Sequence, residues 1–424
     1  MEYIEVTGGN PLWGSIRPAA AKNSVLPLLA ATLLCAQPCT LRRVPLLRDV
    51  QTSLDLLRAV GSGAAWAGQD LVTQPARQIS GRVPTALAGA MRGSVFYLAP
   101  LLTRAGWAEL PLPGGCRLGP RPIDIHLAGL TAMGAQVCAA AECVVLRRHG
   151  VLRGTDFALR LPSVGATLTL MLAACCAAGV TTLRGAACEP EIADTAAFLN
   201  ACGAKITGAG TPVVCIRGTG GELLDGCVHT VLPDRIAAAT YAAAAAIAGG
   251  RVTVTQCSPV WLAAFLDFLQ GSGCEVARGE NEFSITRDRD TKLRGGQELV
   301  AATYPGLATD TAPLAAAVLL GAEGASRIYD GLFQNRFACA QGKVLYLGGS
   351  AKLHGATVTA PDLRGGAALV LAGLGVGDGS CVRVLDAGHI RRGYADLAGD
   401  LRRLGADCRA GRTGTEAGRQ TKKL

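Results

Sequence analysis

The stretch TAAFLNACGAKIT, residues Thr195–Thr207, has the pattern of an apolar helix that ends at Gly203 and passes directly into a strand. Glycine is common just past the last turn of a helix, because it adopts left-handed backbone angles at little cost. The pattern occurs six times, and its glycines are Gly61, Gly134, Gly203, Gly273, Gly348 and Gly405. Subtracting neighbouring numbers gives separations of 73, 69, 70, 75 and 57 residues. The sequence therefore predicts six copies of one unit of roughly 70 residues.

A second kind of helix alternates with the first. It is rich in Ala and Leu and apolar on every side, so it is expected to be buried; DRIAAATYAAAAAIAGG at residues 234–250 is one example. Short β-rich stretches such as RVTVTQ, residues 251–256, separate the two helix types. We predict an α/β protein of two pseudo-symmetric halves, each with three units, buried helices inside and sheets outside.

Composition narrows the class of protein. A chain of 424 residues is too long for one compact core, and half of its residues are apolar. The N-terminus has no basic start followed by an apolar core, which argues against a secretory signal. The Ala-rich runs are shorter than the ~20 apolar residues that cross a bilayer. We therefore expect no membrane insertion and a cytoplasmic location.

The chain has 16 cysteines, scattered among Ala and Val. Cys175 and Cys176 lie side by side in an apolar run, where thiols behave as small core residues. No CxxC pair occurs with a second pair at zinc spacing, so we expect reduced thiols and no metal site.

The formal charge of +9 raises the question of nucleic acid. The basic residues are dispersed singly, aromatic residues make up only 4% of the chain, and no recognition motif is present. A cleft that binds a polyanionic small molecule accounts for the excess equally well, and we expect no nucleic-acid partner.

Polar residues mark the N-terminal ends of the buried helices. They are Lys22 and Asn23, Arg92, Ser163, Asp234 and Arg235, Asp310, and Asp362 with Arg364. Free N–H groups and the helix dipole suit phosphate or carboxylate there. Ordinary capping is the alternative, and we favour it for Ser163 or Asp362 taken alone. Cations at a helix start oppose the dipole, so Lys22, Arg92 and Arg235 together favour one anion-binding cleft between the halves.

One unit is shortened. Gly348 and Asp362 are 14 residues apart, whereas the equivalent distances run from 29 (Gly134 to Ser163) to 37 (Gly273 to Asp310). We expect about one hairpin to be missing there, which exposes a sheet edge or an apolar helix surface.

The loop LPLPGGCRLGPRPIDIH, residues 110–126, gathers a thiol, two cations, a carboxylate and an imidazole. Its three prolines disfavour a helix. Gly114 and Gly115 allow a mobile tip, and a cysteine among cations loses its proton readily. We therefore predict a reactive Cys116. For His126 a structural hydrogen bond is the equally weighted alternative to a binding role.

Together these motifs resemble the enolpyruvyl transferase family. The marks in chain order are AAAKNSVLP, LPGGCRLGPRPIDIH, PSVGAT, EPEIADTAAFLNACGAKI, LPDRI, ATD, FQNRF, DLR and RRGY. They cover nearly the whole chain at matching spacing, apart from the shortened unit. The PGGC loop is similar to that of the branch acting on nucleotide sugars, since the shikimate-pathway branch does not use such a cysteine loop.

The resemblance implies two inverse α/β domains, each with three βαβαββ-type units. The first would span residues 22–232, and the second residues 1–21 with 233–424, including a repeat truncated near 348–362. The implied reaction transfers the enolpyruvyl group of phosphoenolpyruvate to the 3′-hydroxyl of UDP-N-acetylglucosamine by addition and elimination of phosphate. This is the first committed step of peptidoglycan precursor synthesis. It needs no metal or organic cofactor, and we expect a monomer.

The resemblance also assigns roles to residues. Cys116 would protonate the methylene carbon of phosphoenolpyruvate or form an adduct with it, and Asp310 would take the proton of the sugar hydroxyl. Lys22 and Arg392 complete the catalytic set as cations that meet phosphate and carboxylate. The expected substrate contacts are Lys22, Asn23, Arg92, Arg121, Pro122, Ile123, Asp124, Ile125, Ser163, Val164, Gly165, Asp310, Leu332, Arg336, Arg364 and Arg392.

Four positions depart from the family pattern. Arg48 replaces a lysine, Cys188 replaces a basic residue, and Gln334 and Arg391 replace acids. The last two remove negative charge that we expect near the cleft. Two alternatives follow: a degenerate paralogue that binds nucleotide sugar with little turnover, and a transferase acting on shikimate 3-phosphate. Retention of the four catalytic residues favours an active enzyme.

Overall fold

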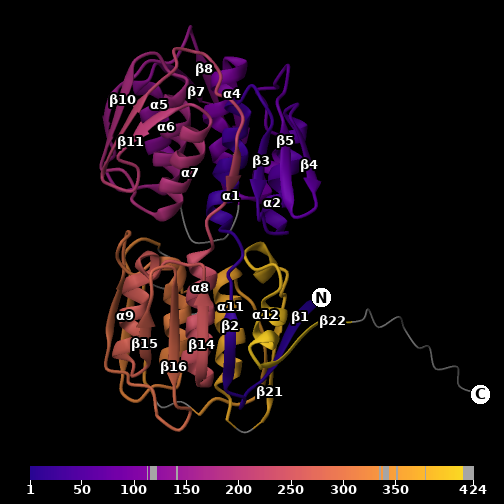
Figure 1. Cartoon of the computed structure of the whole chain (residues 1–424), viewed down its shortest axis with the longest axis vertical. Coiled ribbons are helices and arrows are strands. Elements are labelled where there is room, and N and C mark those ends of the chain that lie inside the picture. Colours follow the sequence, from indigo (N-terminus) through magenta and orange to yellow (C-terminus); the bar gives the residue numbers. More distant parts are fainter. Residues whose placement is uncertain are drawn as a thin grey trace, which may run out of the picture.

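The computed structural model describes residues 1–111, 113–114, 122–139, 142–333, 336–337, 343–349, 352–377 and 379–413. Two lobes lie one above the other (Figure 1). Each lobe encloses its own cluster of buried apolar side chains, one drawn from residues 20–231 and the other from residues 4–16 and 237–408. The mixed α/β architecture confirms the predicted fold class. No helix among the described residues is long and apolar enough to cross a membrane.

The first lobe contains three repeated units. The first unit comprises β3 (Cys39–Arg42), α2 (Arg48–Ala59), β4 (Gly63–Ala67), β5 (Asp70–Gln74), α3 (Thr85–Ala90) and α4 (Leu98–Ala105). The second comprises β6 (Trp107–Pro111), α5 (Asp124–Ala132), β7 (Ala135–Ala139), β8 (Cys143–Arg148), β9 (Asp156–Ala158) and α6 (Val164–Cys175). The third comprises β10 (Val180–Arg184), α7 (Pro190–Ala201), β11 (Lys205–Thr207), β12 (Val213–Arg217), β13 (Val228–Thr230) and α8 (Arg235–Ala248), of which α8 packs in the second lobe.

The second lobe repeats the plan. Its first unit comprises β14 (Gly250–Thr255), α9 (Ala263–Gly271), β15 (Glu275–Arg278), β16 (Glu282–Arg287), β17 (Glu298–Ala301) and α10 (Ala312–Leu320). The next comprises β18 (Ser326–Asp330), β19 (Val344–Leu347), β20 (Ala356–Thr359) and α11 (Leu363–Leu374). The last combines both ends of the chain in β21 (Cys381–Leu385), α12 (Leu397–Arg403), β22 (Asp407–Arg412), β1 (Glu2–Thr7), β2 (Leu12–Ile16) and α1 (Lys22–Ala31), of which α1 packs in the first lobe.

The sheets share one strand order. In β15-β16-β14-β2, the strand β14 pairs parallel with β2 and antiparallel with β16, and β15 pairs antiparallel with β16. The sheet β20-β21-β1-β22 has the same order, so the N-terminal strand lies between strands from the end of the chain. This arrangement fixes β2, and therefore the start of α1, at the junction between the lobes.

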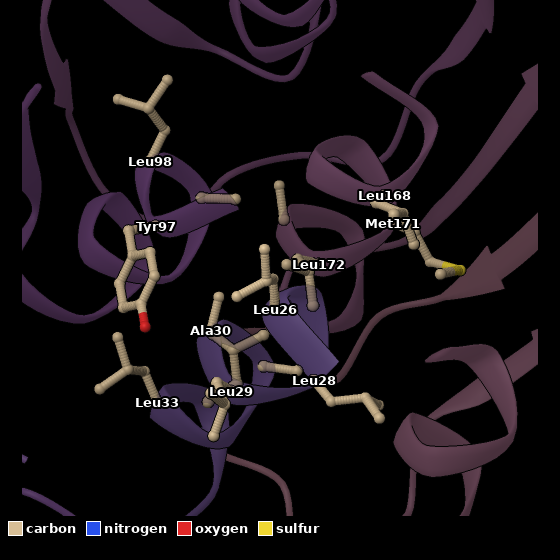
Figure 2. Packing of buried hydrophobic residues seen from close by; sticks show 14 of the residues in the cluster. Leu26, Leu28, Leu29, Ala30, Leu33, Tyr97, Leu98, Leu168, Met171 and Leu172 are labelled. Atoms are coloured by element: carbon tan, nitrogen blue, oxygen red, sulfur yellow. The ribbon is translucent and has the colours of Figure 1, made fainter. Parts of the chain in front are cut away.

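The buried helices form the centre of each lobe. All 14 residues of α8 are buried, and their Ala-rich surface packs against α10 and α11. In the first lobe, side chains of α1 such as Leu26 and Leu29 meet Tyr97 and Leu172 (Figure 2). Removal of such apolar surface from water is the main favourable contribution to folding. The prediction of an all-round apolar inner helix in each lobe is confirmed.

The glycine pattern is correct at five of its six positions. Gly61, Gly134, Gly203, Gly273 and Gly405 all have φ between 96° and 103°, the left-handed region expected after a helix. The exception is the copy KVLYLGGSAKL, whose apolar residues form strand β19 and no helix. Four to eight apolar residues before a glycine fit a strand or a helix end equally well by periodicity alone.

The predicted position of the shortening, near 348–362, is therefore wrong. That stretch contains β20, which pairs parallel with β21 as its counterparts do in the other units. The sheet β17-β18-β19 has three strands, and the described residues between β18 and β19 contain no surface helix. These two strands are separated by residues 331–343, 13 positions, against residues 256–281, 26 positions, between β14 and β16. The shortened unit therefore lacks a surface helix and one strand, and the missing segment precedes Gly348.

The chain passes between the lobes at two adjacent segments. Ala20 and Pro233 form an antiparallel bridge, in which Ala21 N–H donates to Leu232 O (2.8 Å) and Asp234 N–H donates to Ala19 O (2.8 Å). We propose that the domains divide here, into residues 22–232 and residues 1–21 with 233–424. Such a paired double connection can act as a hinge while it keeps the starts of α1 and α8 side by side.

Candidate active site

A buried carboxylate connects the two lobes. Asp49, in the first turn of α2, is only 4% exposed and accepts from Lys22 Nζ at 3.3 Å and from Arg392 Nε at 2.9 Å. Lys22 begins α1 in the first lobe, and Arg392 ends a 3₁₀ turn (Ile390–Arg392) of the second. Two predicted catalytic cations are thus brought together. The sequence analysis did not single out Asp49, because an acid in a first helical turn is ordinary.

Asp310 is held by cations of the second lobe. It lies in a 3₁₀ turn (Thr309–Thr311) at the start of α10, where Arg336 Nη2 donates to Oδ1 at 2.9 Å and Arg364 Nη2 lies 3.6 Å from Oδ2. Burial acts to raise the pKa of Asp310, but the charges of Arg364, Arg336, Lys22 and Arg235 outweigh it and hold the pKa well below its usual range. The carboxylate is therefore ionised, and Lys22 lies within its electrostatic reach. Three predicted catalytic residues, Lys22, Asp310 and Arg392, thus share one region between the lobes.

Asp330 organises the segment that supplies Arg336. Asp330 ends β18, is fully buried, and accepts from the backbone N–H groups of Leu332 (2.8 Å) and Phe333 (2.9 Å). Arg336 Nε lies 3.6 Å from Asp330 and donates to Thr309 Oγ1 at 2.8 Å. The side chain of Leu332 is 45% exposed, as a substrate-contact position requires. Asp330 was missed by the sequence analysis, since a single Asp at a strand end carries no distinctive pattern.

The buried helix-start arginines have protein partners. Arg364 Nη1 donates to Tyr394 Oη at 3.1 Å, with its guanidinium 5.4 Å from the ring centroid. Arg235 Nε donates to Glu191 Oε1 at 3.1 Å, and both residues are more than nine-tenths buried. Because Glu191 belongs to α7, this pair is a second connection between the lobes. Arg235 therefore serves the interface, in addition to its electrostatic effect on Asp310.

The polar residues at the remaining helix starts are caps. Asp362 Oδ1 accepts from the N–H groups of Arg364 and Gly365, each at 2.8 Å, and Ser163 Oγ accepts from Ala166 N–H at 3.3 Å. Asp234 caps α8 in the same way. The capping interpretation of Ser163 and Asp362 is confirmed. A substrate contact by Ser163, Val164 or Gly165 at the start of α6 stays a prediction.

The segment predicted to hold the uridine begins α5. Asp124 forms an ion pair with Arg160, and although burial acts to raise the pKa of Asp124, Arg160 lowers it overall. Both side chains are more than half exposed, so a ligand can reach them. Ile123 and Ile125 point into the core at 8% and 7% exposure, which leaves chiefly their backbone for binding. Pro122 is exposed and its carbonyl accepts from Arg92 Nη2 at 3.4 Å.

Three sequence predictions lie outside the described residues: those for Cys116, Arg121 and Gln334. Asn23 is half-buried beside Lys22 on α1. Arg391 differs from the expectation, because its Nε lies 3.6 Å from Glu2 of β1 and its side chain is 57% exposed. The Arg391 replacement therefore adds charge to an outer sheet, whereas its neighbour Arg392 faces Asp49.

His126 is buried among apolar groups at 4% exposure, and neither ring nitrogen has a hydrogen-bond partner among the described residues. The predicted structural hydrogen bond is thus not found there. A Cβ at Gly165 would lie 2.7 Å from His126 Nε2, so the glycine lets the ring pack against α6. Burial lowers the pKa of His126 to about 4, with Arg92 acting in the same direction and Asp124 against it.

This lowered pKa predicts a loss of stability on acidification. The unfolded chain protonates His126 near pH 6.5, whereas the folded chain resists protonation until about pH 4, so folding free energy is lost as pH falls through that window. Between pH 7.5 and pH 5 the loss is about 2 kcal/mol, and His126→Leu should remove it. Urea unfolding at both pH values measures it, with the exposed His149→Leu as the matched control. The same pH dependence in wild type and His126→Leu would contradict the assignment.

A cavity of 520 Å³ lies beside the crossing segments, lined in part by Arg17, Arg43, Trp66, Tyr241 and Arg403. None of the predicted substrate contacts lines it. The candidate active site is instead the charged cluster around Asp49 and Asp310, because there the ionisable groups of both lobes converge.

Comparisons with known proteins agree with this architecture and site. The model of the EPSP synthase (3-phosphoshikimate 1-carboxyvinyltransferase) family matches residues 6–401, and the chain belongs to this family. The family predicted from the motifs is thereby confirmed.

Individual relatives are more specific. The chain is 39% identical to UDP-N-acetylglucosamine 1-carboxyvinyltransferase 2 of Caldanaerobacter subterraneus subsp. tengcongensis, over 96% of this chain and 99% of that protein. It is 40% identical to UDP-N-acetylglucosamine 1-carboxyvinyltransferase of Finegoldia magna, over 96% and 98%. Among solved structures, the enolpyruvyl transferase NikO from Streptomyces tendae superposes with a TM-score of 0.84 at 26% identity, covering 96% of this chain and 98% of that one.

Proposed function

We propose that this protein transfers the enolpyruvyl group of phosphoenolpyruvate to the 3′-hydroxyl of UDP-N-acetylglucosamine and releases phosphate. The observation that carries the proposal is the convergence of Lys22, Arg392, Arg336 and Arg364 from two lobes around the carboxylates Asp49 and Asp310. Phosphoenolpyruvate carries a phosphate and a carboxylate, which such a cluster can bind. The two relatives about 40% identical to the chain support the nucleotide sugar as acceptor.

Asp49 holds the two cations that would bind phosphoenolpyruvate. In its buried position it neutralises Lys22 and Arg392 and keeps them near each other. An anionic substrate would compete with Asp49 for their N–H groups and then connect the lobes in its place. Binding energy would thus draw the lobes together around the reactants, which excludes water and strengthens the electrostatic interactions.

Asp310 would act as the base, although its pKa in the free protein is well below its usual range. Its low pKa arises from neighbouring cations, and two anionic substrates would offset much of their charge. The pKa of Asp310 should therefore rise in the complex, closer to the value at which a carboxylate accepts a proton efficiently.

The reaction then balances in two steps. The sugar 3′-oxygen loses its proton to Asp310 and bonds to C2 of phosphoenolpyruvate, while C3 gains a proton; Cys116 is our candidate donor. In the second step C3 loses a proton, the bond from C2 to the phosphate oxygen breaks, and phosphate leaves as the double bond forms again. Lys22 and Arg392 would stabilise the charge on the phosphate.

We assign this reaction to the first committed step of peptidoglycan precursor synthesis. We further propose a cytoplasmic location, which suits a chain with many cysteines, and a monomeric state. Size-exclusion chromatography with light scattering tests the monomer.

Phosphate release tests the proposed function. Purified protein with phosphoenolpyruvate and UDP-N-acetylglucosamine should release phosphate, and shikimate 3-phosphate in place of the nucleotide sugar should release none. Turnover of shikimate 3-phosphate would assign the protein to the other branch of the family. Calorimetric binding of the nucleotide sugar without phosphate release would identify a paralogue that has lost turnover.

A further inference from the structure

Four cysteines converge in the first lobe, far apart in sequence and away from the active site. The Sγ atoms of Cys35, Cys39 and Cys202 all lie within 4.8 Å of one another, and the Sγ of Cys227 lies 3.3 Å from that of Cys202. Cys227 is also within electrostatic reach of Cys35 and Cys39. Three of the four thiols are fully buried and Cys227 is half-buried.

We propose that these four thiols form a structural site for a thiophilic divalent cation, with Zn²⁺ as the expected ion. A tetrahedral zinc with sulfur ligands has Zn–S distances of about 2.3 Å, which places the sulfurs about 3.8 Å apart. The observed separations of 3.3 Å, and of up to 4.8 Å, lie around this value. Small side-chain rotations are enough to adopt the metal geometry.

The backbone around the cluster is already fixed. Cys35 follows a 3₁₀ turn (Thr32–Leu34), Cys39 begins β3, Cys202 caps α7, and Cys227 precedes β13. Hydrogen bonds connect these segments: Thr40 N–H donates to Cys227 O (2.9 Å), Asp225 N–H to Cys202 O (2.9 Å), and Ala36 N–H to Leu224 O (2.7 Å). The four ligands therefore come from elements that hold one another in place, as a preorganised site requires.

The site would also tolerate the charge of bound thiolates. Arg104 is within electrostatic reach of Cys35, and it is positioned by hydrogen bonds to Leu33 O and Ala76 O, each 2.7 Å. This cation offsets part of the negative charge that four thiolates retain around Zn²⁺. The half-buried Cys227 marks the side from which an ion can enter.

A structural role follows from the location. Lys22 begins α1, and Cys35 lies beyond its other end, about 15 Å away along a ten-residue helix. The ion would connect residues 35–39, early in the lobe, to residues 202–227 near its end. It would thus stabilise the first lobe without a direct part in the proposed reaction.

This inference revises the expectation of no metal site. That expectation rested on the lack of paired CxxC motifs. Here the ligand spacing is C-x₃-C followed by two single cysteines more than 160 residues later (202 minus 39 is 163). A disulfide between Cys202 and Cys227 is the competing interpretation, but it leaves the convergence of Cys35 and Cys39 on the same point unexplained.

Metal analysis tests the site on the full chain. Protein purified under reducing conditions from zinc-supplemented cells should retain one zinc per chain after gel filtration. After removal of zinc, added Co²⁺ should give the visible and sulfur-to-metal charge-transfer absorption of a tetrahedral thiolate site. Cys39→Ser and Cys202→Ser should each lose the metal and the spectrum, whereas Cys257→Ser and Cys274→Ser, buried single thiols of the other lobe, should keep both.

The unmodified protein supplies a second measurement in case a variant fails to fold. Chelation of the metal under reducing conditions should lower the melting temperature, and re-addition of Zn²⁺ should restore it. The proposal is overturned if reduced protein binds neither Zn²⁺ nor Co²⁺, or if mass spectrometry finds a Cys202–Cys227 disulfide and no metal. These readouts do not depend on turnover, so they stand apart from the proposed function.

Discussion

Asp310→Asn should lower kcat by about 10²- to 10⁴-fold, the usual contribution of a positioned general base. The substitution keeps the shape of the side chain and removes its ability to accept the proton of the sugar hydroxyl. It also removes a negative charge from the reach of Arg336, Arg364, Lys22 and Arg235. The remaining cations should then bind phosphoenolpyruvate at least as tightly as in the wild type.

The separation of turnover from binding makes this prediction specific. Steady-state phosphate release gives kcat, and calorimetry gives the dissociation constants of the two substrates. A variant that had lost its fold would lose both properties. Asp267→Asn provides the control, because Asp267 forms a surface ion pair with Arg278 and its side chain is 64% exposed. Full activity of Asp310→Asn would remove Asp310 from the mechanism.

Arg392→Ala should lower kcat/KM for phosphoenolpyruvate by about 10²- to 10³-fold, the range found when one donor to a developing anion is removed. The guanidinium of Arg392 is 14% exposed and reaches across the lobe boundary to Asp49. Its removal eliminates a contact to the anionic substrate and also the ion pair between lobes. Affinity for the nucleotide sugar should change little, because its predicted contacts are on the first lobe.

The adjacent residue is a matched control. Arg391→Ala removes the same side chain one position earlier, where it faces Glu2 on an outer sheet, and should leave kcat/KM within about twofold because an exposed ion pair contributes little. Arg392→Lys keeps the charge but not the planar fork, so it should recover only part of the loss. Equal effects of Arg391→Ala and Arg392→Ala would mean that general charge, and not position, controls turnover.

Much of the architecture was predictable from local patterns. The apolar helix followed by glycine appears at Gly61, Gly134, Gly203, Gly273 and Gly405 because a helix end needs a left-handed residue wherever it occurs. The Ala-rich helices could be placed inside because they have no polar face. The error at Gly348 arose where a four-residue strand had the composition of a helix end, a case in which periodicity carries no information.

The candidate site divides in the same way. Cations and carboxylates at helix starts indicated which residues to examine, and Lys22, Asp310 and Arg392 do lie together. The sequence gave no signal for Asp49, Asp330 or Glu191, each a single acid whose partner is 6 to 343 positions away (336 minus 330; 392 minus 49). Such pairs exist only once the chain has folded, since they depend on which lobe surfaces meet.

The sequence by itself determined the repeated unit, the buried helices and the family, because periodic burial and family motifs are written into neighbouring residues. Only the tertiary structure decided which cations are paired, where the shortened unit lost its helix and strand, and that four distant thiols converge. Ion pairs and metal ligands act over a few ångströms in space, and separation along the chain says little about that distance.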